Sequence, residues 1–180
     1  MVVTTGAKPS RAGSKVSGTI VLGIGNRLGG DDAAGSLVVD ALNLALARRS
    51  AKLPKRSASK CAEIVAIDVG TAPESYTSTI RKRRPDLLIL IDAADMALHP
   101  GAVRIVPRGR ISALSFSTHH MPLSMFISYV EQFCGRILLV GLQPERTDAG
   151  TPLSKAVSAS VRKVARAILE GTVTEIPALE

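Results

Sequence analysis

The chain carries an apolar run that leads directly into a glycine-rich turn and then into two adjacent acids. The run is Val21–Ile24, glycines recur from Gly25 to Gly35, and the acids are Asp31 and Asp32. This order predicts a buried strand, a tight turn and the start of a helix. Dinucleotide-binding proteins place a pyrophosphate at such a helix start. Here the third glycine is displaced and two acids would repel a phosphate, so we expect a metal ion or another cation instead.

Apolar runs alternate with amphipathic stretches along the rest of the chain, which is typical of α/β proteins. The pattern predicts a three-layer α/β/α sandwich with a twisted, mostly parallel sheet of about five strands and about four helices. The continuous apolar run 87–91 predicts a central strand buried on both faces, and the run 102–106, bounded by prolines, an edge strand. The expected strands are 19–24, 63–67, 87–91, 102–106 and 136–142, and the expected helices are 32–47, 74–83, 122–133 and 152–169.

The length and composition favour one domain. A chain of 180 residues with 46% hydrophobic residues is long enough to bury its own core. We expect a domain over 19–171, a basic N-terminal tail over 1–18 and a C-terminal tail over 172–180. No apolar run approaches the ~20 residues of a membrane span, and the N-terminal segment lacks the apolar stretch of a secretory signal. We therefore expect a cytoplasmic protein without membrane insertion. We also expect a monomer, because no long apolar stripe is left over once the helices cover the sheet.

The formal net charge of +8 raises the question of nucleic-acid binding. Basic residues are concentrated in 48–60, which we expect to be a surface loop, and in the last predicted helix. The chain has two Tyr, three Phe and no Trp, so it offers few side chains that could stack on bases. We favour a solvated basic surface and expect no nucleic-acid partner.

Acids follow three of the predicted strands. Asp31 and Asp32 follow the first, Asp68 the second and Asp92 the third. Because ligands of open α/β sheets gather beyond the carboxyl ends of the strands, we expect these acids to share one site. A single acid after a strand is often only a turn or cap residue, but three on one edge indicate a site.

A pair of histidines, His119 and His120, precedes the predicted helix that starts at Pro122. Carboxylates together with imidazole suit a divalent transition metal such as nickel or zinc. The chain contains no G-x-S-x-G, H-E-x-x-H or P-loop motif. Hydrolysis would therefore depend on carboxylates or on a metal-activated water, and not on a covalent nucleophile.

In these residues the chain resembles the hydrogenase maturation endopeptidases, which trim the C-terminal extension from the large subunit of nickel-iron hydrogenases. The resemblance covers roughly residues 20–164, and its details are similar to the branch that serves formate-hydrogenlyase (hydrogenase 3-type) enzymes. The matching segments, in order, are Gly23-x-Gly25-Asn26, Asp31-Asp32-x-x-Gly35, Asp68-x-Gly70-Thr71-Ala72-Pro73-Glu74, Asp92-Ala93-x-Asp95-Met96, Thr118-His119-x-Met121-Pro122-Leu123 and Gly141-x-Gln143-Pro144-Glu145.

The resemblance implies roles for individual residues. Asp32, Asp92 and His119 would bind a metal, which is nickel already carried by the substrate, although zinc or cadmium could occupy the same ligands. Asp68 would be the catalytic candidate, with water activated either by this carboxylate or by the metal. The partner would be a large-subunit precursor. We also expect substrate contacts from Gly25, Asn26, Gly70, Thr71 and His120.

Two departures from the family pattern concern the site. Val69 stands where the family often has a glycine, and His120 replaces a residue that commonly bears an amide, so either His119 or His120 could be the ligand. The alternative function is a non-enzymatic chaperone that binds the nickel-loaded subunit without cutting it.

Overall fold

A single five-stranded sheet forms the centre of the computed structural model, which describes residues 18–52, 63–114 and 121–180. The strand order is β2-β1-β3-β5-β4, and every neighbouring pair is parallel except β4 and β5. The predicted mostly parallel sheet is therefore confirmed. The strands are β1 (Gly18–Ile24), β2 (Glu63–Gly70), β3 (Leu87–Ala93), β4 (Val103–Ile105) and β5 (Arg136–Leu142).

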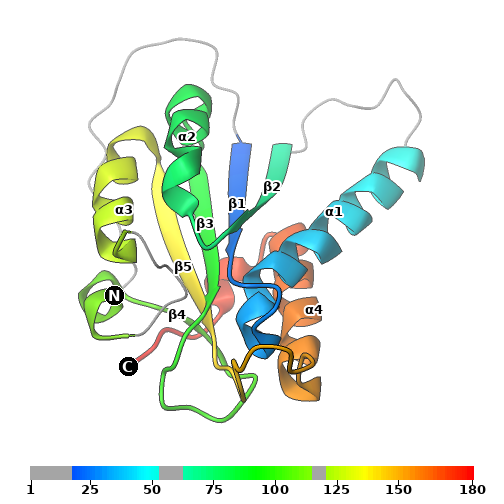
Figure 1. Ribbon diagram of the computed structural model, residues 1–180. Coiled ribbons are helices and arrows are strands. Elements are labelled where there is room, and N and C mark those ends of the chain that lie inside the picture. The colour runs from blue at the N-terminus through cyan, green and yellow to red at the C-terminus, as the bar shows by residue number, and fades with distance from the viewer. Residues whose placement is uncertain (1–17, 53–62, 115–120) are drawn as a thin grey trace.

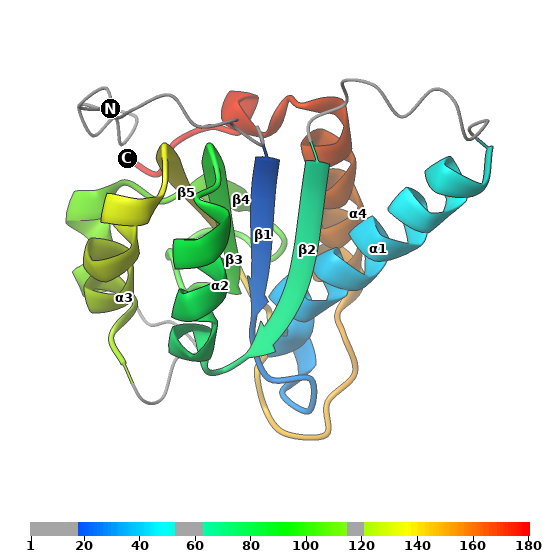
Figure 2. The ribbon, with the colours of Figure 1, turned by 90° about the horizontal axis from the view of Figure 1, so that it is seen from above.

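Two pairs of helices cover the two faces of this sheet (Figures 1 and 2). One face packs against α2 (Thr77–Arg83) and α3 (Leu123–Val130), and the other against α1 (Ala34–Lys52) and α4 (Lys155–Glu170). The side chains of β3 alternate between the two cores: Leu88 and Leu90 enter the first, and Ile89 and Ile91 the second. This is the predicted three-layer sandwich. Across the described ranges, no helix is long and apolar enough to cross a membrane.

Helix α1 differs from its predicted bounds at both ends. A short 3-10 turn, Gly30–Ala33, precedes it, so Asp32 lies in this turn and not in the helix. At the other end the helix continues to Lys52, whereas we had expected a loop from residue 48. Arg, Lys and Ala are good helix formers, so the basic run 48–52 extends the helix. The remainder of the expected loop, 53–60, lies outside the described residues.

The two edges of the sheet are built differently. Beyond β4, the backbone N–H of Leu179 donates to the carbonyl of Ile105 (2.9 Å), and the N–H of Ile105 donates to the carbonyl of Pro177 (2.9 Å). The segment 177–179, which follows α4 and lies within the expected C-terminal tail, thus pairs with β4 through an isolated parallel bridge. Strand β2 forms the opposite edge.

Candidate active site

The predicted acids lie at the carboxyl ends of three adjacent parallel strands. Asp32 follows β1, Asp68 is near the end of β2, and Asp92 is near the end of β3. The backbone N–H of Gly25 donates to the carbonyl of Gly70 (3.0 Å) and joins the loops that follow β1 and β2. The parallel arrangement therefore brings the three acids to the same end of the sheet, where the carboxyl ends of the strands lie.

Asp31 has a structural role that its neighbour does not share. Its side chain is fully buried and accepts hydrogen bonds from the backbone N–H groups of Ser154 (2.7 Å) and Glu145 (2.8 Å). Its own backbone N–H donates to the carbonyl of Arg146 (3.1 Å). Asp31 thus anchors the connection between β5 and α4. The adjacent acids are not one cation-binding pair, and only Asp32 remains a candidate ligand.

Asp32 is held by the loop that follows β1. Its carboxylate accepts from the backbone N–H of Asn26 (3.2 Å), and its own backbone N–H donates to the carbonyl of Gly29 (2.9 Å). Gly25 adopts a φ of +146°, and a Cβ there would overlap the carbonyl oxygen of Asp32. Only glycine fits at this position. Gly25 and Asn26, predicted as substrate contacts, therefore also determine where Asp32 lies.

Asp68 is surrounded by hydrogen-bond donors. Its Oδ1 accepts from the hydroxyl of Ser36 (2.7 Å) and the backbone N–H of Gly70 (3.1 Å), and its Oδ2 accepts from Nε of Arg27 (2.8 Å). Burial of the carboxyl by itself would raise its pKa. These hydrogen bonds and the positive charge of Arg27 outweigh burial, so the pKa of Asp68 lies below the usual range for aspartate.

Arg27 is a residue of the site that sequence reasoning did not identify. Its guanidinium binds Asp40 on α1 through Nη1 (2.8 Å) and Nη2 (2.9 Å), and it also contacts Asp68 through Nε and Nη2. The hydrogen bonds to Asp40 and then those to Asp68 raise the pKa of Arg27 further, so its charge is permanent. The only signal in the sequence was a basic residue within an acidic, glycine-rich loop.

Asp92 is fully buried in the central strand β3. Because side chains alternate along a strand, Asp92 lies on the same face as Leu90, toward α2 and α3. Asp68, in contrast, points toward Ser36 on α1, which covers the other face. Asp68 and Asp92 both lie near the carboxyl ends of their strands, but their side chains point to opposite faces of the sheet.

Gln143 and Asp95, which belong to two of the matching segments, form one hydrogen-bonded network, in which Gln143 is buried and Asp95 is exposed. The side-chain oxygen of Gln143 accepts from the backbone N–H groups of Met96 (2.7 Å) and Leu98 (3.2 Å), and its amide donates to Asp95 (3.2 Å). This network fixes the loop after β3. The two residues can therefore belong to the sequence pattern because they support this loop, without taking part in the reaction.

The predicted histidine ligand cannot be placed, because His119 and His120 lie outside the described residues. Thr71 is described and half-buried directly after β2. Within the described ranges, no group of three or more His, Cys, Asp or Glu side chains is arranged to hold a metal ion. Asp32 and Asp92 are the two predicted ligands that the structure describes, and both lie at the carboxyl ends of the strands.

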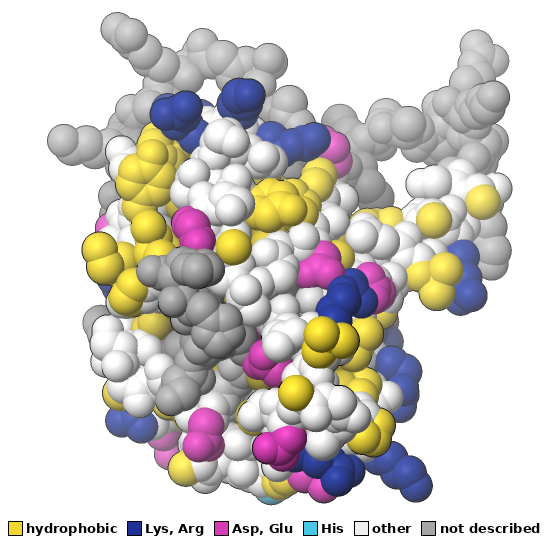
Figure 3. Space-filling model, in the orientation of Figure 1, with side chains coloured by type: hydrophobic (Ala, Val, Ile, Leu, Met, Phe, Trp, Pro, Cys, Tyr) yellow, Lys and Arg dark blue, Asp and Glu magenta, His cyan; other side chains and the backbone are white. Residues whose placement is uncertain are grey.

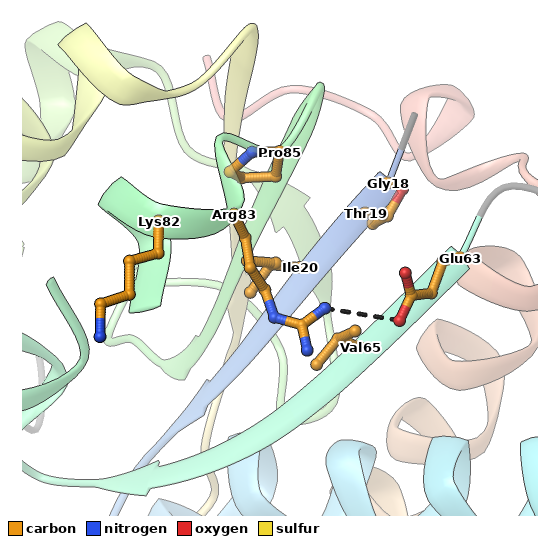
Figure 4. A pocket seen from close by; sticks show the side chains of 8 residues that line it. All are labelled: Gly18, Thr19, Ile20, Glu63, Val65, Lys82, Arg83 and Pro85. Atoms are coloured by element: carbon orange, nitrogen blue, oxygen red, sulfur yellow. Dashed lines mark hydrogen bonds and ion pairs between the residues drawn. The ribbon is translucent and has the colours of Figure 1, made fainter. Parts of the chain in front are cut away.

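A hollow of about 440 Å³ lies at the opposite end of the sheet and is not part of this site. It opens between α2 and the amino ends of β1 and β2, and an ion pair between Arg83 and Glu63 (3.4 Å) crosses it (Figure 4). Among the described residues on the face in Figure 3, Lys and Arg are interspersed with Asp and Glu and do not form one continuous basic stripe.

The low pKa of Asp68 leads to a testable pH dependence. Because the pKa is lower in the folded chain than in the unfolded one, ionised Asp68 stabilises the fold above the unfolded pKa, and this contribution is lost as the pH falls through the folded pKa. We expect the ¹³Cγ resonance of Asp68 to titrate below the usual aspartate range and its midpoint to rise in Arg27→Ala. An unchanged midpoint would show that Arg27 does not act on this carboxyl.

Comparison with solved structures defines the class of the protein. Its fold is similar to the crystal structure of the hydrogenase 3 maturation protease, with a TM-score of 0.76 and 29% identity, over 93% of this chain and 99% of the other. It is similar also to the solution structure of the endopeptidase HycI from Escherichia coli, with a TM-score of 0.73 and 30% identity, over 91% and 97% of the two chains. The fold is that of a maturation protease.

The sequence identifies the family. The model of the hydrogenase maturation protease family matches residues 48–171. The hydrogenase 3 maturation protease of Escherichia coli is 34% identical over 146 residues, which cover 81% of this chain and 85% of the relative. The chain therefore belongs to the hydrogenase maturation protease family and is a protease, as the resemblance of its motifs had implied.

Proposed function

We propose that this protease removes the C-terminal extension from the large-subunit precursor of a nickel-iron hydrogenase, and that nickel already installed in the precursor is its recognition mark. The observation that carries the proposal is the placement of Asp32 and Asp92 at the ends of adjacent strands, on a chain of this family. Both side chains are carboxylates on rigid elements, which suits a defined docking geometry.

The donor set supports a metal that arrives with the substrate. Two carboxylates are a poor resident site for nickel, which favours nitrogen and sulfur ligands as well. A metal that keeps its ligands in the precursor needs only a few more contacts from the protease. Asp32, Asp92 and one histidine, His119 or His120, would supply them. An empty precursor would lack this anchor and would not be held with its tail in the site.

The reaction is the addition of water to the scissile peptide bond. The oxygen of water bonds to the carbonyl carbon, the carbon–nitrogen bond breaks, and the departing amine takes up a proton. The sequence left two routes for activating this water, the substrate's metal and the carboxylate of Asp68. Both fit a protease that works without a covalent intermediate.

The test is mass spectrometry of a cognate precursor incubated with the protease, with and without nickel installed. We expect the loss of one C-terminal peptide from the nickel-loaded precursor and none from the empty one. Cleavage of both forms would contradict nickel as the recognition mark. An unchanged mass of the nickel-loaded precursor would favour a binding function without cleavage.

A further inference from the structure

We propose that Arg27 is a positioning residue of the active site, which ties the loop 26–29 to Asp68 and Asp40 and thereby fixes Asp32. In this arrangement Asp68 is the anchor of Arg27 and does not accept the proton of the attacking water. The inference rests on the proposed function for its effect on cleavage, but its structural part can be tested without any substrate.

Both oxygens of Asp68 are engaged by donors of the protein itself. Ser36 and Gly70 donate to Oδ1, while Nε of Arg27 donates to Oδ2 and Nη2 of Arg27 lies 2.7 Å from the same oxygen. An ionised carboxylate has about four acceptor positions, so these contacts already engage both oxygens, although the Asp68 side chain is still 29% exposed. To accept a proton from water, Asp68 would have to give up one of these contacts. A general base must have its acceptor within hydrogen-bond reach of the proton that it removes.

The side chains of Asp68 and Asp92 leave the sheet on opposite faces. Asp68 points toward Ser36 on α1, and Asp92 lies on the sheet face that α2 and α3 cover. The carboxylate of Asp92, one of the proposed contacts to the substrate's metal, therefore lies on the other face of the sheet from the carboxylate of Asp68. Asp68 instead faces the loop 26–29 and α1, to which Arg27 and Ser36 tie it.

Arg27 belongs to the loop that binds Asp32. The loop 26–29 is closed by two hydrogen bonds to Asn26: its side-chain oxygen accepts from the N–H of Leu28 (3.0 Å), and its carbonyl accepts from the N–H of Gly29 (3.0 Å). The same loop binds Asp32 through the Asn26 N–H and the Gly29 carbonyl. Arg27 is the residue of this loop whose side chain reaches both β2 and α1.

The bridge has the geometry of a strong ion pair despite its partial exposure. The side chains of Arg27 and Asp40 are 47% and 52% exposed, so a single contact would contribute little to stability. Arg27, however, binds Asp40 in a two-pronged manner and Asp68 at the same time. Planar, two-pronged guanidinium contacts add geometric specificity as well as energy. We therefore expect this bridge to affect the position of the loop 26–29 more than the free energy of unfolding.

The experiment compares Arg27→Ala, Asp68→Asn and the double variant. Hydrogen exchange of the Asn26, Leu28 and Gly29 amides should become about 10-fold faster in each single variant. The melting temperature should be nearly unchanged in Arg27→Ala, because the Arg27 side chain is 47% exposed. Cleavage of the nickel-loaded precursor should show kcat reduced by about 10- to 100-fold and KM within about twofold, because misplacing a reacting group acts on the chemical step. The double variant should be no worse than either single variant, since both break the same link.

Matched variants make the result specific. Arg27→Lys keeps the charge but loses the two-pronged geometry, so it should restore only part of the rate. Arg108→Ala removes a comparably exposed arginine paired with Glu131, remote from the site, and should leave exchange and cleavage as in the natural chain. If Asp68→Asn abolishes cleavage while Arg27→Ala keeps the natural rate, Asp68 takes part in the chemistry and the proposal is wrong. Unchanged amide exchange in Arg27→Ala also overturns it, even if no precursor is cut.

Discussion

Asp32→Ala and Asp92→Ala should each slow the processing of a nickel-loaded precursor by at least about 100-fold, the size expected when a preorganised charged contact is lost. Asp92 is fully buried at the end of the central strand, so no neighbouring side chain can replace it without moving the sheet. Asp32 is fixed by its contacts with the loop 26–29. The measurement is the fraction of cleaved precursor over time, followed by mass spectrometry. From the family resemblance of the sequence we expect the same loss in His119→Ala, or in His120→Ala if His120 is the ligand.

The control for these variants is Asp86→Ala. Asp86 is an exposed acid directly before β3, at the opposite end of the sheet. The Asp86→Ala variant should therefore process the precursor at the natural rate. Asp92→Asn, which preserves the volume of the buried side chain, should lose activity while keeping its unfolding midpoint. Full processing by the Asp32, Asp92 and His119 variants would refute the assignment of these residues as the docking site for nickel.

Asp31→Ala should destabilise the fold by about 3 kcal/mol or more. The variant removes a buried carboxylate and leaves the N–H groups of Ser154 and Glu145 without their acceptor. Ser154 is buried, and a buried donor that loses its partner costs about 1–3 kcal/mol. The loss of the charged hydrogen bonds from the N–H groups of Glu145 and Arg146, which are exposed residues, adds to this cost. Urea unfolding followed by circular dichroism gives the free energy of unfolding directly.

Asp32→Ala is the matched comparison for Asp31→Ala, because the two residues are adjacent and the change is identical. Asp32 is only half-buried and lies at the site, so its replacement should alter the free energy of unfolding by about 1 kcal/mol at most. A stable Asp31→Ala variant that had lost processing would instead place Asp31 in the active site. The pair therefore separates support of the fold from the function of the site.

The sequence was sufficient to predict the sheet because its strands are apolar runs between clear breaks. Parallel strands place their carboxyl ends together, so the common edge of Asp32, Asp68 and Asp92 followed as well. Arg27 could not be predicted, because its partners Asp40 and Asp68 are 13 and 41 positions away and meet only in the folded chain. The same holds for Asp31, whose acceptor role depends on backbone groups 114 and 123 positions away.

Other expectations concern properties that the fold does not determine. Nickel as the recognition mark, the choice between His119 and His120, the cytoplasmic location and the monomeric state stay predictions. So do the domain boundaries at residues 18 and 171. These depend on partners and surroundings, or on segments outside the described residues, and not on the packing of the sheet.

The contact between α1 and the sheet has a consequence for how the protease can move. A Cβ on Gly35 would overlap the carbonyl oxygens of Ile24 and Ile91, so the first turn of α1 rests directly on the ends of β1 and β3. Because the backbone of α1 contacts the backbone of the two strands here, no layer of side chains lies between them. Shear motions need such a layer, along which packed elements can slide. The helix start and the two strand ends should therefore move as one rigid body. If Asp32 and Asp92 dock the precursor as proposed, adaptation to a bulky precursor must come from the loops of the protease, because the distance between these two carboxylates should stay constant.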